Sequence, residues 1–268
     1  MEKSQIAQTQ KNDRIGIAAL KRILNNESIQ KKFSDMLGKK AAGFITSVIN
    51  VCQNNSMLSN ADANSVVLAA ASAAALDLPV NPNLGYAAII PYYDSKNKVT
   101  VAQFQLQRNA WVELAMRTGQ VVRIANEPVY KGELVSKNRF TDEYVFDESK
   151  RESDEIIGYM AYAKLVNGYE KTVYWTVQEC KEHGKRYSQT FKNGKGLWVD
   201  NFSAMALKTV LKHLIVKYLP KSIELTTAIE RDQAELRGDI DNIEPEYIDN
   251  VKDKEPFVDF EEVEQNKE

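Results

Sequence analysis

The segment from His183 to Trp198 contains the residues best suited to binding a polyanion. It reads HGKRYSQTFKNGKGLW and has no acidic residue; its basic residues are Lys185, Arg186, Lys192 and Lys195. Lys and Arg neutralise phosphates, and an aromatic ring such as Tyr187 stacks on bases of any sequence. We interpret the segment as a flexible loop that binds nucleic acid. The alternative is an exposed loop whose aromatic residues are anchored in the core.

A second basic set lies on a predicted helix, residues 200–219. Apolar residues recur along one face of this helix, and the other face carries Lys208, Lys212 and Lys217. Lys208 and Lys212 are one turn apart, so both ammonium groups can reach neighbouring phosphates. An ordinary solvated lysine face is the alternative. We expect replacement of both residues by Ala to reduce nucleic-acid binding and to leave the fold intact.

Residues typical of catalysis or metal binding are sparse. His183 and His213 are about thirty residues apart with no Cys or His neighbour, which argues against a zinc site. Cys52 and Cys180 lack a nearby second thiol and are expected to be free. The acidic run 142–155 could hold magnesium, but its intermixed basic residues favour a solvated loop. A Walker-type loop is absent from the sequence. We therefore predict a binding protein rather than an enzyme, with no metal site.

Charge is divided unevenly along the chain. The 268 residues sum to −2, but residues 1–223 contain 30 Lys and Arg against 21 Asp and Glu, and residues 224–268 contain 5 against 16. The first block therefore carries +9 and the second −11. The second block, which prolines interrupt, is predicted to be a disordered acidic tail with a short helix at its start. Such a tail could bind a partner or compete with DNA for the basic surface.

Hydrophobic periodicity suggests the elements that position these residues. Apolar residues at three- and four-residue steps predict two or three amphipathic helices over residues 14–52, with basic doublets on their polar faces. An alanine-rich helix is predicted from Asp62 or Asn64 to Leu78. The longest apolar stretch is about half of the ~20 residues that a membrane span needs, and the N-terminus lacks the apolar core of a signal peptide. A cytoplasmic protein is expected.

The central part of the chain alternates with the period of strands. Hairpins are predicted over residues 85–107 and 156–176, the second with an Asn-Gly turn. In the first hairpin the even positions 102–106 form a core face, and Gln103, Gln105 and Gln107 form a row of amides on the other face. Residues 108–118 predict a short helix, and residues 120–130 predict a strand.

Several blocks resemble the RecT family of single-strand DNA annealing proteins from phages and prophages, here of a Gram-positive host. The blocks are LDLPVNPNLGYAAIIPYYD, VAQFQLQRNAWVELAMRTGQVVRIANEPVY, YAKL and LWVDNFSAMALKTVLKHLIVKYLPKSIEL, which span residues 76–225 in order. One departure concerns the family's Gly-Tyr-(Arg or Lys)-Gly block. This chain has Gln107, Arg108, Asn109 and Ala110 there, so the basic residue is kept and the glycines are not.

The resemblance implies an α+β annealing-protein fold, a curved antiparallel β-hairpin sheet crossed by helices. It also implies an oligomeric ring or helical filament that binds single-stranded DNA and the annealed duplex intermediate in a basic groove without ATP. We expect residues 1–60 to make subunit contacts, residues 61–223 to form the DNA-binding core and residues 224–268 to form the tail. The alternative is an oligomeric single-stranded nucleic-acid-binding scaffold without pairing activity.

Site residues and partners follow from the same resemblance. Expected partners are a phage exonuclease and the host single-strand-binding protein, with no membrane; no cofactor is required, and a role for magnesium is left open. The DNA-binding residues expected are Gln105, Gln107, Arg108, Arg117, Arg123, Lys185, Arg186, Tyr187, Lys192, Lys195, Lys208, Lys212 and Lys217.

Overall fold

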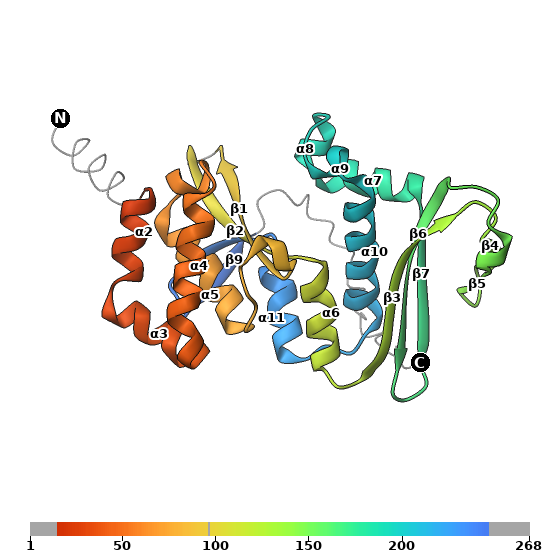
Figure 1. Ribbon diagram of the computed structural model, residues 1–268, viewed down its shortest axis with the longest axis horizontal. Coiled ribbons are helices and arrows are strands. Elements are labelled where there is room, and N and C mark those ends of the chain that lie inside the picture. The colour runs from red at the N-terminus through yellow and green to blue at the C-terminus, as the bar shows by residue number, and fades with distance from the viewer. Residues whose placement is uncertain (1–14, 96, 247–268) are drawn as a thin grey trace, which may run out of the picture.

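The N-terminal part of the chain is helical, as its periodicity predicts. The computed structural model describes residues 15–95 and 97–246 (Figure 1). Its first helices are α2 (Ile17–Leu24), α3 (Glu27–Leu37) and α4 (Ala41–Gln53), with the 3-10 turns η1 (Gly38–Lys40) and η2 (Leu58–Asn60). Asn26 begins α3 by accepting the Ser28 N–H at 2.9 Å. Gly38, with φ 57°, ends it in a backbone region that favours glycine.

Helix α5 (Ala63–Ala75) is buried along almost its whole length. Small alanine side chains allow its neighbours to approach closely, and it packs on α2, α3 and the hairpin β1 (Ala87–Asp94) and β2 (Val99–Leu106). Asp62 caps α5 by accepting the Ser65 N–H at 2.8 Å. Ser65 in turn accepts the Ala102 N–H at 2.8 Å, which ties the helix to β2. The predicted capping residue and hairpin are both confirmed.

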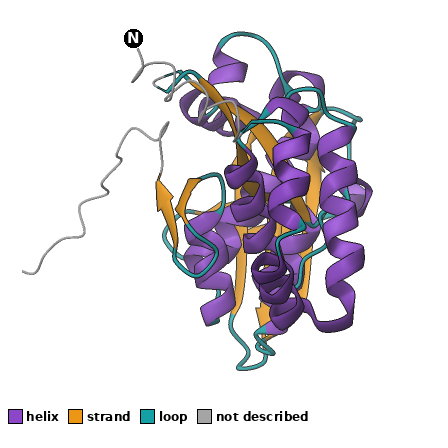
Figure 2. Cartoon of the chain, turned by 90° about the vertical axis from the view of Figure 1, so that its left-hand side faces the viewer, coloured by secondary structure: helices purple, strands orange, loops and turns teal. Residues whose placement is uncertain are grey.

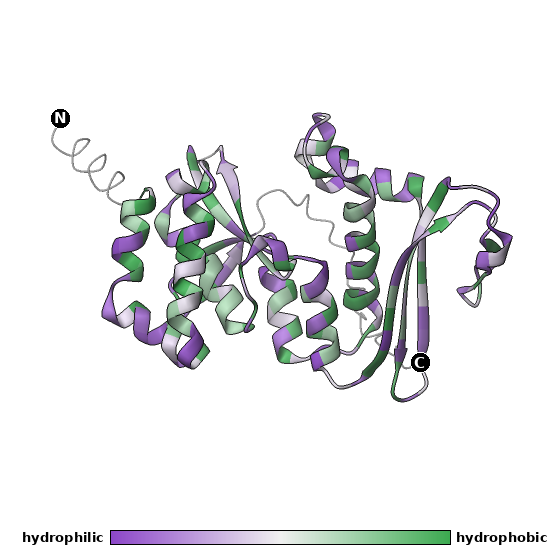
Figure 3. Cartoon of the chain, in the orientation of Figure 1, coloured by the Kyte–Doolittle hydropathy of each residue, from purple (hydrophilic) through white to green (hydrophobic). Residues whose placement is uncertain are grey.

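A three-stranded antiparallel sheet of order β3-β6-β7 forms the other half of the molecule. It consists of β3 (Val121–Tyr130), β6 (Ile156–Leu165) and β7 (Glu170–Thr176). Helix α10 (Phe202–Tyr218) packs across one face of the sheet, against buried Tyr159, Ala161 and Ala163. Figure 3 shows α10 as hydrophobic over much of its length. The fold is therefore α+β with antiparallel strands, as predicted; the described strands are divided among separate sheets, and a curved sheet stays a prediction.

Two helices lie between these halves. Helix α6 (Arg108–Arg117) follows β2 directly, and α11 (Ile223–Arg231) follows α10 after Pro220. Both helices contact each other, and α6 also contacts α10 (Figure 1). Viewed from the α2–α4 end, helices lie in front of the strands (Figure 2). The two halves thus share a continuous hydrophobic core, in which Trp111 is completely buried.

The short helix predicted at the start of the acidic C-terminal block is confirmed as α11, but the prediction of a disordered tail is wrong for the residues that follow it up to Glu246. After α11, the strands β8 (Glu235–Gly238) and β9 (Ile243–Glu246) form a hairpin that contacts β2 and α5. Ala234 and Leu236 are buried in the core, which explains why this acidic segment is ordered. Residues 247–268, the rest of the predicted tail, lie outside the described residues.

The acidic run 142–155 was expected to be a solvated loop, and the structure instead places part of it in a hairpin. Strands β4 (Leu134–Asn138) and β5 (Glu143–Phe146) pair antiparallel, followed by the 3-10 turn η4 (Glu148–Lys150). Tyr144 and Phe146 pack on Tyr174 of β7, with ring centroids 5.9 and 6.0 Å apart respectively. These aromatic contacts, which link segments distant in sequence, order the hairpin.

The two cysteines are buried and unbonded, as expected. Burial raises the pKa of Cys52 to about 11 and that of Cys180 to about 12, the latter with a contribution from Glu179. Among the described residues, no helix is long and apolar enough to cross a membrane.

Candidate nucleic-acid interface

Three helices form a cap over one end of α10, built from residues 177–200 and here called the basic cap (Figure 1). They are α7 (Val177–Tyr187), α8 (Gln189–Lys192) and α9 (Leu197–Asp200). Thr176 and Glu179 form the predicted capping box at the start of α7. The expected flexible loop is therefore wrong, since most of the segment is helical.

Packing around Gly184 explains the order of the cap. A Cβ on this buried glycine would lie 3.0 Å from both the Phe191 and Trp198 rings, so only glycine allows these rings to approach α7 so closely. The rings themselves have centroids 5.8 Å apart. The aromatic residues of the segment thus anchor the cap, while its basic residues remain outside the core.

The cations of the basic cap are exposed. Lys185 and Arg186 lie in the last turn of α7, Lys192 ends α8, and Lys195 lies in the turn before α9. Tyr187 is 45% exposed and lies against His183, with centroids 4.6 Å apart. The Arg186 guanidinium is 5.9 Å from the Tyr187 centroid. The structure therefore exposes four basic residues and one ring on the same cap, and their predicted contact with DNA stays a prediction.

The Tyr187 ring belongs to a cluster of aromatic and imidazole rings that are tilted relative to one another. Trp175 of β7 has its centroid 5.2 Å from that of His183 and 5.0 Å from that of His213. Burial lowers the pKa of His183 to about 4, and the nearby Lys212, His213 and Arg186 add to this effect. His183 is therefore neutral at physiological pH and supports the cap by packing.

The outer face of β2 carries the predicted amide row. Gln103, Gln105 and Gln107 are partly exposed, whereas Ala102, Phe104 and Leu106 are buried. Because α5 covers the inner face, the amides point away from the N-terminal helices. In Figure 1 the β1–β2 hairpin and the basic cap rise on the same side of the molecule.

Arg108 and Arg123 lie on neighbouring elements with different environments. Arg108 begins α6, and its Nε donates to the Asn126 side-chain oxygen at 3.1 Å. Asn126 is 2% exposed and donates to the Met160 carbonyl at 2.9 Å. Arg123 is exposed on β3, opposite Lys164 of β6. Arg123 can therefore reach a ligand without rearrangement, whereas Arg108 is partly engaged with β3.

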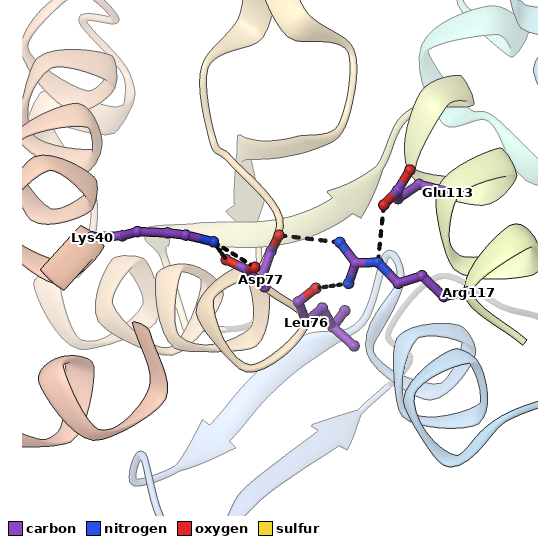
Figure 4. A network of polar contacts seen from close by, with 5 residues as sticks. All are labelled: Lys40, Leu76, Asp77, Glu113 and Arg117. Carbon is purple, nitrogen blue, oxygen red and sulfur yellow. Dashed lines mark hydrogen bonds and ion pairs between the residues drawn. The ribbon is translucent and has the colours of Figure 1, made fainter. Parts of the chain in front are cut away.

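Arg117 links helices within the chain, rather than projecting freely (Figure 4). Its guanidinium donates to the Leu76 carbonyl at 2.6 Å and to the Asp77 carbonyl at 3.5 Å, and it pairs with Glu113 at 3.0 Å. These carbonyls lie just beyond the C-terminus of α5, where a cation is favourable. Lys40 also pairs with the Asp77 carboxylate, at 2.7 Å. The structure thus gives Arg117 a positioning role, and its predicted contact with DNA stays untested.

The lysines of α10 were predicted to reach phosphates, with a solvated face as the alternative, and the structure corrects both for Lys208, which is buried. Lys208 is only 8% exposed, and burial lowers its pKa, with Lys212 adding to the effect and Asp232 opposing it. The Lys212 Nζ donates to Asp232 at 2.6 Å and lies 5.3 Å from the Trp111 centroid. The helix is surrounded by β6, β7, α6 and the cap, so its polar face is largely covered. Lys217 remains exposed, 5.7 Å from the Tyr218 centroid.

Asp232 is an important residue that sequence reasoning missed. Its side chain is fully buried and accepts both the Leu106 N–H at 2.8 Å and the Lys212 ammonium. It thereby joins β2, α10 and the segment after α11. Nothing in the sequence distinguishes Asp232 from the other acids of the C-terminal block.

Comparison with known proteins shows which family the chain belongs to. The model of the RecT family matches residues 42–248, which is most of the chain. The chain belongs to the RecT family. It is 43% identical over 226 residues to the protein YqaK of Bacillus subtilis (strain 168), covering 84% of this chain and 76% of YqaK. It is 29% identical over 181 residues to Protein RecT of Escherichia coli (strain K12), covering 66% of each.

Membership of the RecT family supports DNA binding and single-strand annealing in recombination, with single-stranded DNA and copies of the same chain as partners. Proteins of this family are annealing proteins rather than typical enzymes. Within residues 15–95 and 97–246, His, Cys, Asp and Glu form no group of three or more that could hold a metal ion.

Proposed function

We propose that the protein anneals complementary DNA strands without nucleotide hydrolysis, as a homo-oligomer that holds the first strand on the basic cap and the amide face of β2. The observation that carries this proposal is the basic cap, which exposes Lys185, Arg186, Lys192 and Lys195 and also the Tyr187 ring, with the Arg186 guanidinium 5.9 Å from its centroid. Exposed cations bind a phosphate backbone in any sequence, and the ring offers a stacking surface.

The amides of β2 complement this cap. Gln105 and Gln107 are neutral donors and acceptors, so they can contact a strand without adding charge. Arg108 and Arg123 supply positive charge near α6 and β3. Complementary strands select each other by Watson–Crick pairing, so the protein needs only to hold the backbone extended and offset the repulsion between two strands. Repeated contacts from an oligomer then add along the strand.

An annealing assay tests the proposal directly. Two labelled complementary strands are mixed with and without the protein, with no nucleotide present. We expect the protein to accelerate duplex formation. Binding of single strands without acceleration would instead indicate a scaffold that does not promote pairing, and shortening of the strands would indicate a nuclease.

The cap makes a sharper prediction. Replacing Lys185, Lys192 and Lys195 by Ala should weaken single-strand binding and reduce the slope of log affinity against log salt by about 2, because each phosphate contact contributes roughly 0.7 for single strands. Fluorescence anisotropy at several salt concentrations measures both quantities. A matched control replaces three exposed basic residues outside the cap, Lys98, Lys221 and Arg237, by Ala. Equal slopes in the two variants would remove the cap from the binding surface.

Tyr187→Ala separates stacking from charge. We expect this variant to lose binding free energy of about 1–3 kcal/mol at all salt concentrations, with the salt slope kept, since no cation is removed. The same anisotropy series provides the measurement, and Tyr93→Ala, at another exposed tyrosine, is the control. An unchanged affinity for Tyr187→Ala would show that the ring does not contact bases.

A further inference from the structure

The two ends of the molecule carry opposite charge. Residues 131–155, here called the acidic arm, contain the β4–β5 hairpin and have eight acidic against five basic residues, a net charge of −3. Residues 15–60, here called the helical end, contain α2–α4 and have six basic against two acidic residues, a net charge of +4. Figure 1 shows the two regions at opposite ends of the long axis.

The acidic arm has a defined position on the molecule. Aromatic packing of Tyr144 and Phe146 on Tyr174 holds its inner face, and Lys171 of β7 pairs with Asp142. At its base, Gly132 has φ 93° and lies so close to the Lys150 carbonyl that a Cβ would collide with it. The arm is thus built to hold a shape, which a recognition surface requires.

The arm exposes both carboxylates and apolar side chains. Glu148, Glu152 and Glu155 are exposed, and within the described part of the chain their carboxylates form no ion pair. Phe140 at the tip is 85% exposed and Val145 is 52% exposed. Exposed apolar side chains together with unpaired carboxylates suit a protein–protein contact.

The helical end presents the complementary charge. Lys21 of α2, Lys31 of α3 and Lys39 of η1 are exposed. None of the three forms an ion pair with another residue in the ranges 15–95 and 97–246. Their neighbours Lys32 and Lys40 are paired with Asp241 and Asp77. Three cations are therefore available for acidic groups from outside the chain.

We propose that the acidic arm of one copy binds the helical end of a second copy. The two surfaces differ, so the contact is head-to-tail, and each added copy presents the same unused arm to the next; such contacts produce rings or helical filaments. This inference rests on the homo-oligomer of the proposed function and identifies the surfaces that form it. A nucleic acid is a poor occupant of the arm, because its phosphates would be repelled by the carboxylates.

Charge reversal at each surface tests the contact. The arm variant carries Glu148→Lys, Glu152→Lys and Glu155→Lys; the helical-end variant carries Lys21→Glu, Lys31→Glu and Lys39→Glu. Light scattering at low salt, with and without a single-stranded oligonucleotide, measures the mass. We expect the wild type to be oligomeric and each variant to fall to the 30.3 kDa of one chain. Circular dichroism checks that both variants are folded.

Mixing the two variants provides a rescue. A lysine arm then faces a glutamate helical end, and the wild-type arm of the second variant faces the wild-type helical end of the first, so assembly should return with the two variants alternating. The matched control, Glu127→Lys with Glu224→Lys and Glu244→Lys, makes the same change of charge outside the arm, the helical end and the basic cap and should keep the wild-type mass.

Several results would overturn the contact. The first is a wild type that stays monomeric with and without DNA. The second is that the arm variant or the helical-end variant, measured alone, keeps the wild-type mass. The third is a mixture of the two variants that remains at 30.3 kDa. A helical-end variant that keeps its mass and loses DNA affinity would assign these lysines to nucleic acid. A negative result for this contact can be told apart from a negative result for annealing. Light scattering measures the mass without any pairing of strands, and the annealing assay uses the wild-type chain.

Discussion

At the scale of single residues, Asp232 shows how one buried charge connects three parts of the chain. Its carboxylate has no exposure and accepts from the Leu106 amide and the Lys212 ammonium, with Lys208 buried nearby. Removing one partner of such a pair leaves an uncompensated charge in the interior. The lysines of α10 therefore have a structural role whatever they contribute to binding.

We predict that Lys212→Ala lowers the free energy of unfolding by about 3 kcal/mol, because Asp232 then remains buried without its partner. Urea unfolding followed by circular dichroism measures the change. Lys185→Ala on the exposed cap is the control and should stay within about 0.5 kcal/mol of wild type. A stable Lys212→Ala chain would restore the sequence-based expectation that this helix tolerates the substitution.

His183 gives the molecule a pH dependence of known sign. Its pKa is lowered from 6.5 to about 4 by burial, so below pH 6.5 the unfolded chain binds a proton that the folded chain excludes. The free energy of unfolding should therefore fall as the pH drops from about 6.5 toward 4, by roughly 1–3 kcal/mol in total.

The measurement compares wild type with His183→Gln between pH 7.5 and 4. Loss of ring contacts changes the absolute stability of the variant, so the quantity of interest is the difference in pH slope. We expect the slope to be shallower in the variant over this window. Identical slopes would mean that the His183 imidazole accepts a proton in the folded chain.

Residue types alone identified the exposed cations of the cap but not the environment of each one. Lys185 and Lys208 are both lysines that the sequence predicts to contact phosphates. Only the fold shows that Lys185 is exposed and Lys208 is buried. Arg117 likewise lies within the predicted helix and turns out to bind the carbonyls after α5. Such distinctions depend on contacts between distant segments, which periodicity does not describe.

At the scale of elements, the sequence predicted best those helix ends and turns that are determined by residues close together in the chain. The Asp62 cap, the Thr176–Glu179 capping box and the Asn167-Gly168 turn between β6 and β7 are all present where local sequence places them. Elements ordered by distant partners were missed. The β4–β5 hairpin depends on Tyr174, and the β8–β9 hairpin depends on β2 and α5.

The β8–β9 hairpin yields an element-scale prediction. A chain ending at Arg231 loses Asp232 together with the buried residues Ala234 and Leu236, whereas a chain ending at Glu246 keeps them. We expect the shorter chain to melt roughly 10 °C lower than the longer one, or to fail to fold, given about 2–4 °C for each kcal/mol in a domain of this size. Calorimetry of the two truncations decides this. Equal melting temperatures would show that residues 232–246 add nothing to the core.

At the scale of the whole molecule, the net charge of −2 does not show that basic and acidic surfaces lie at different places. The sequence shows a body of +9 and a C-terminal block of −11. The structure refines this division: the cap and the helical end are basic, while the acidic arm lies within the body and part of the acidic block is packed against α5. Charge along the chain predicted a binding protein, and only the fold shows which surfaces of opposite sign lie far apart.

The burial of both cysteines has a practical consequence for studying this assembly. Only the thiolate reacts readily, and Cys52 and Cys180 are inaccessible with pKa values of about 11 and 12. At neutral pH the native chain should therefore resist maleimide labelling. A single cysteine introduced at Val166 or Tyr93, both exposed, can then carry a fluorophore or spin label without removal of the native thiols, and distances between neighbouring copies on DNA become measurable.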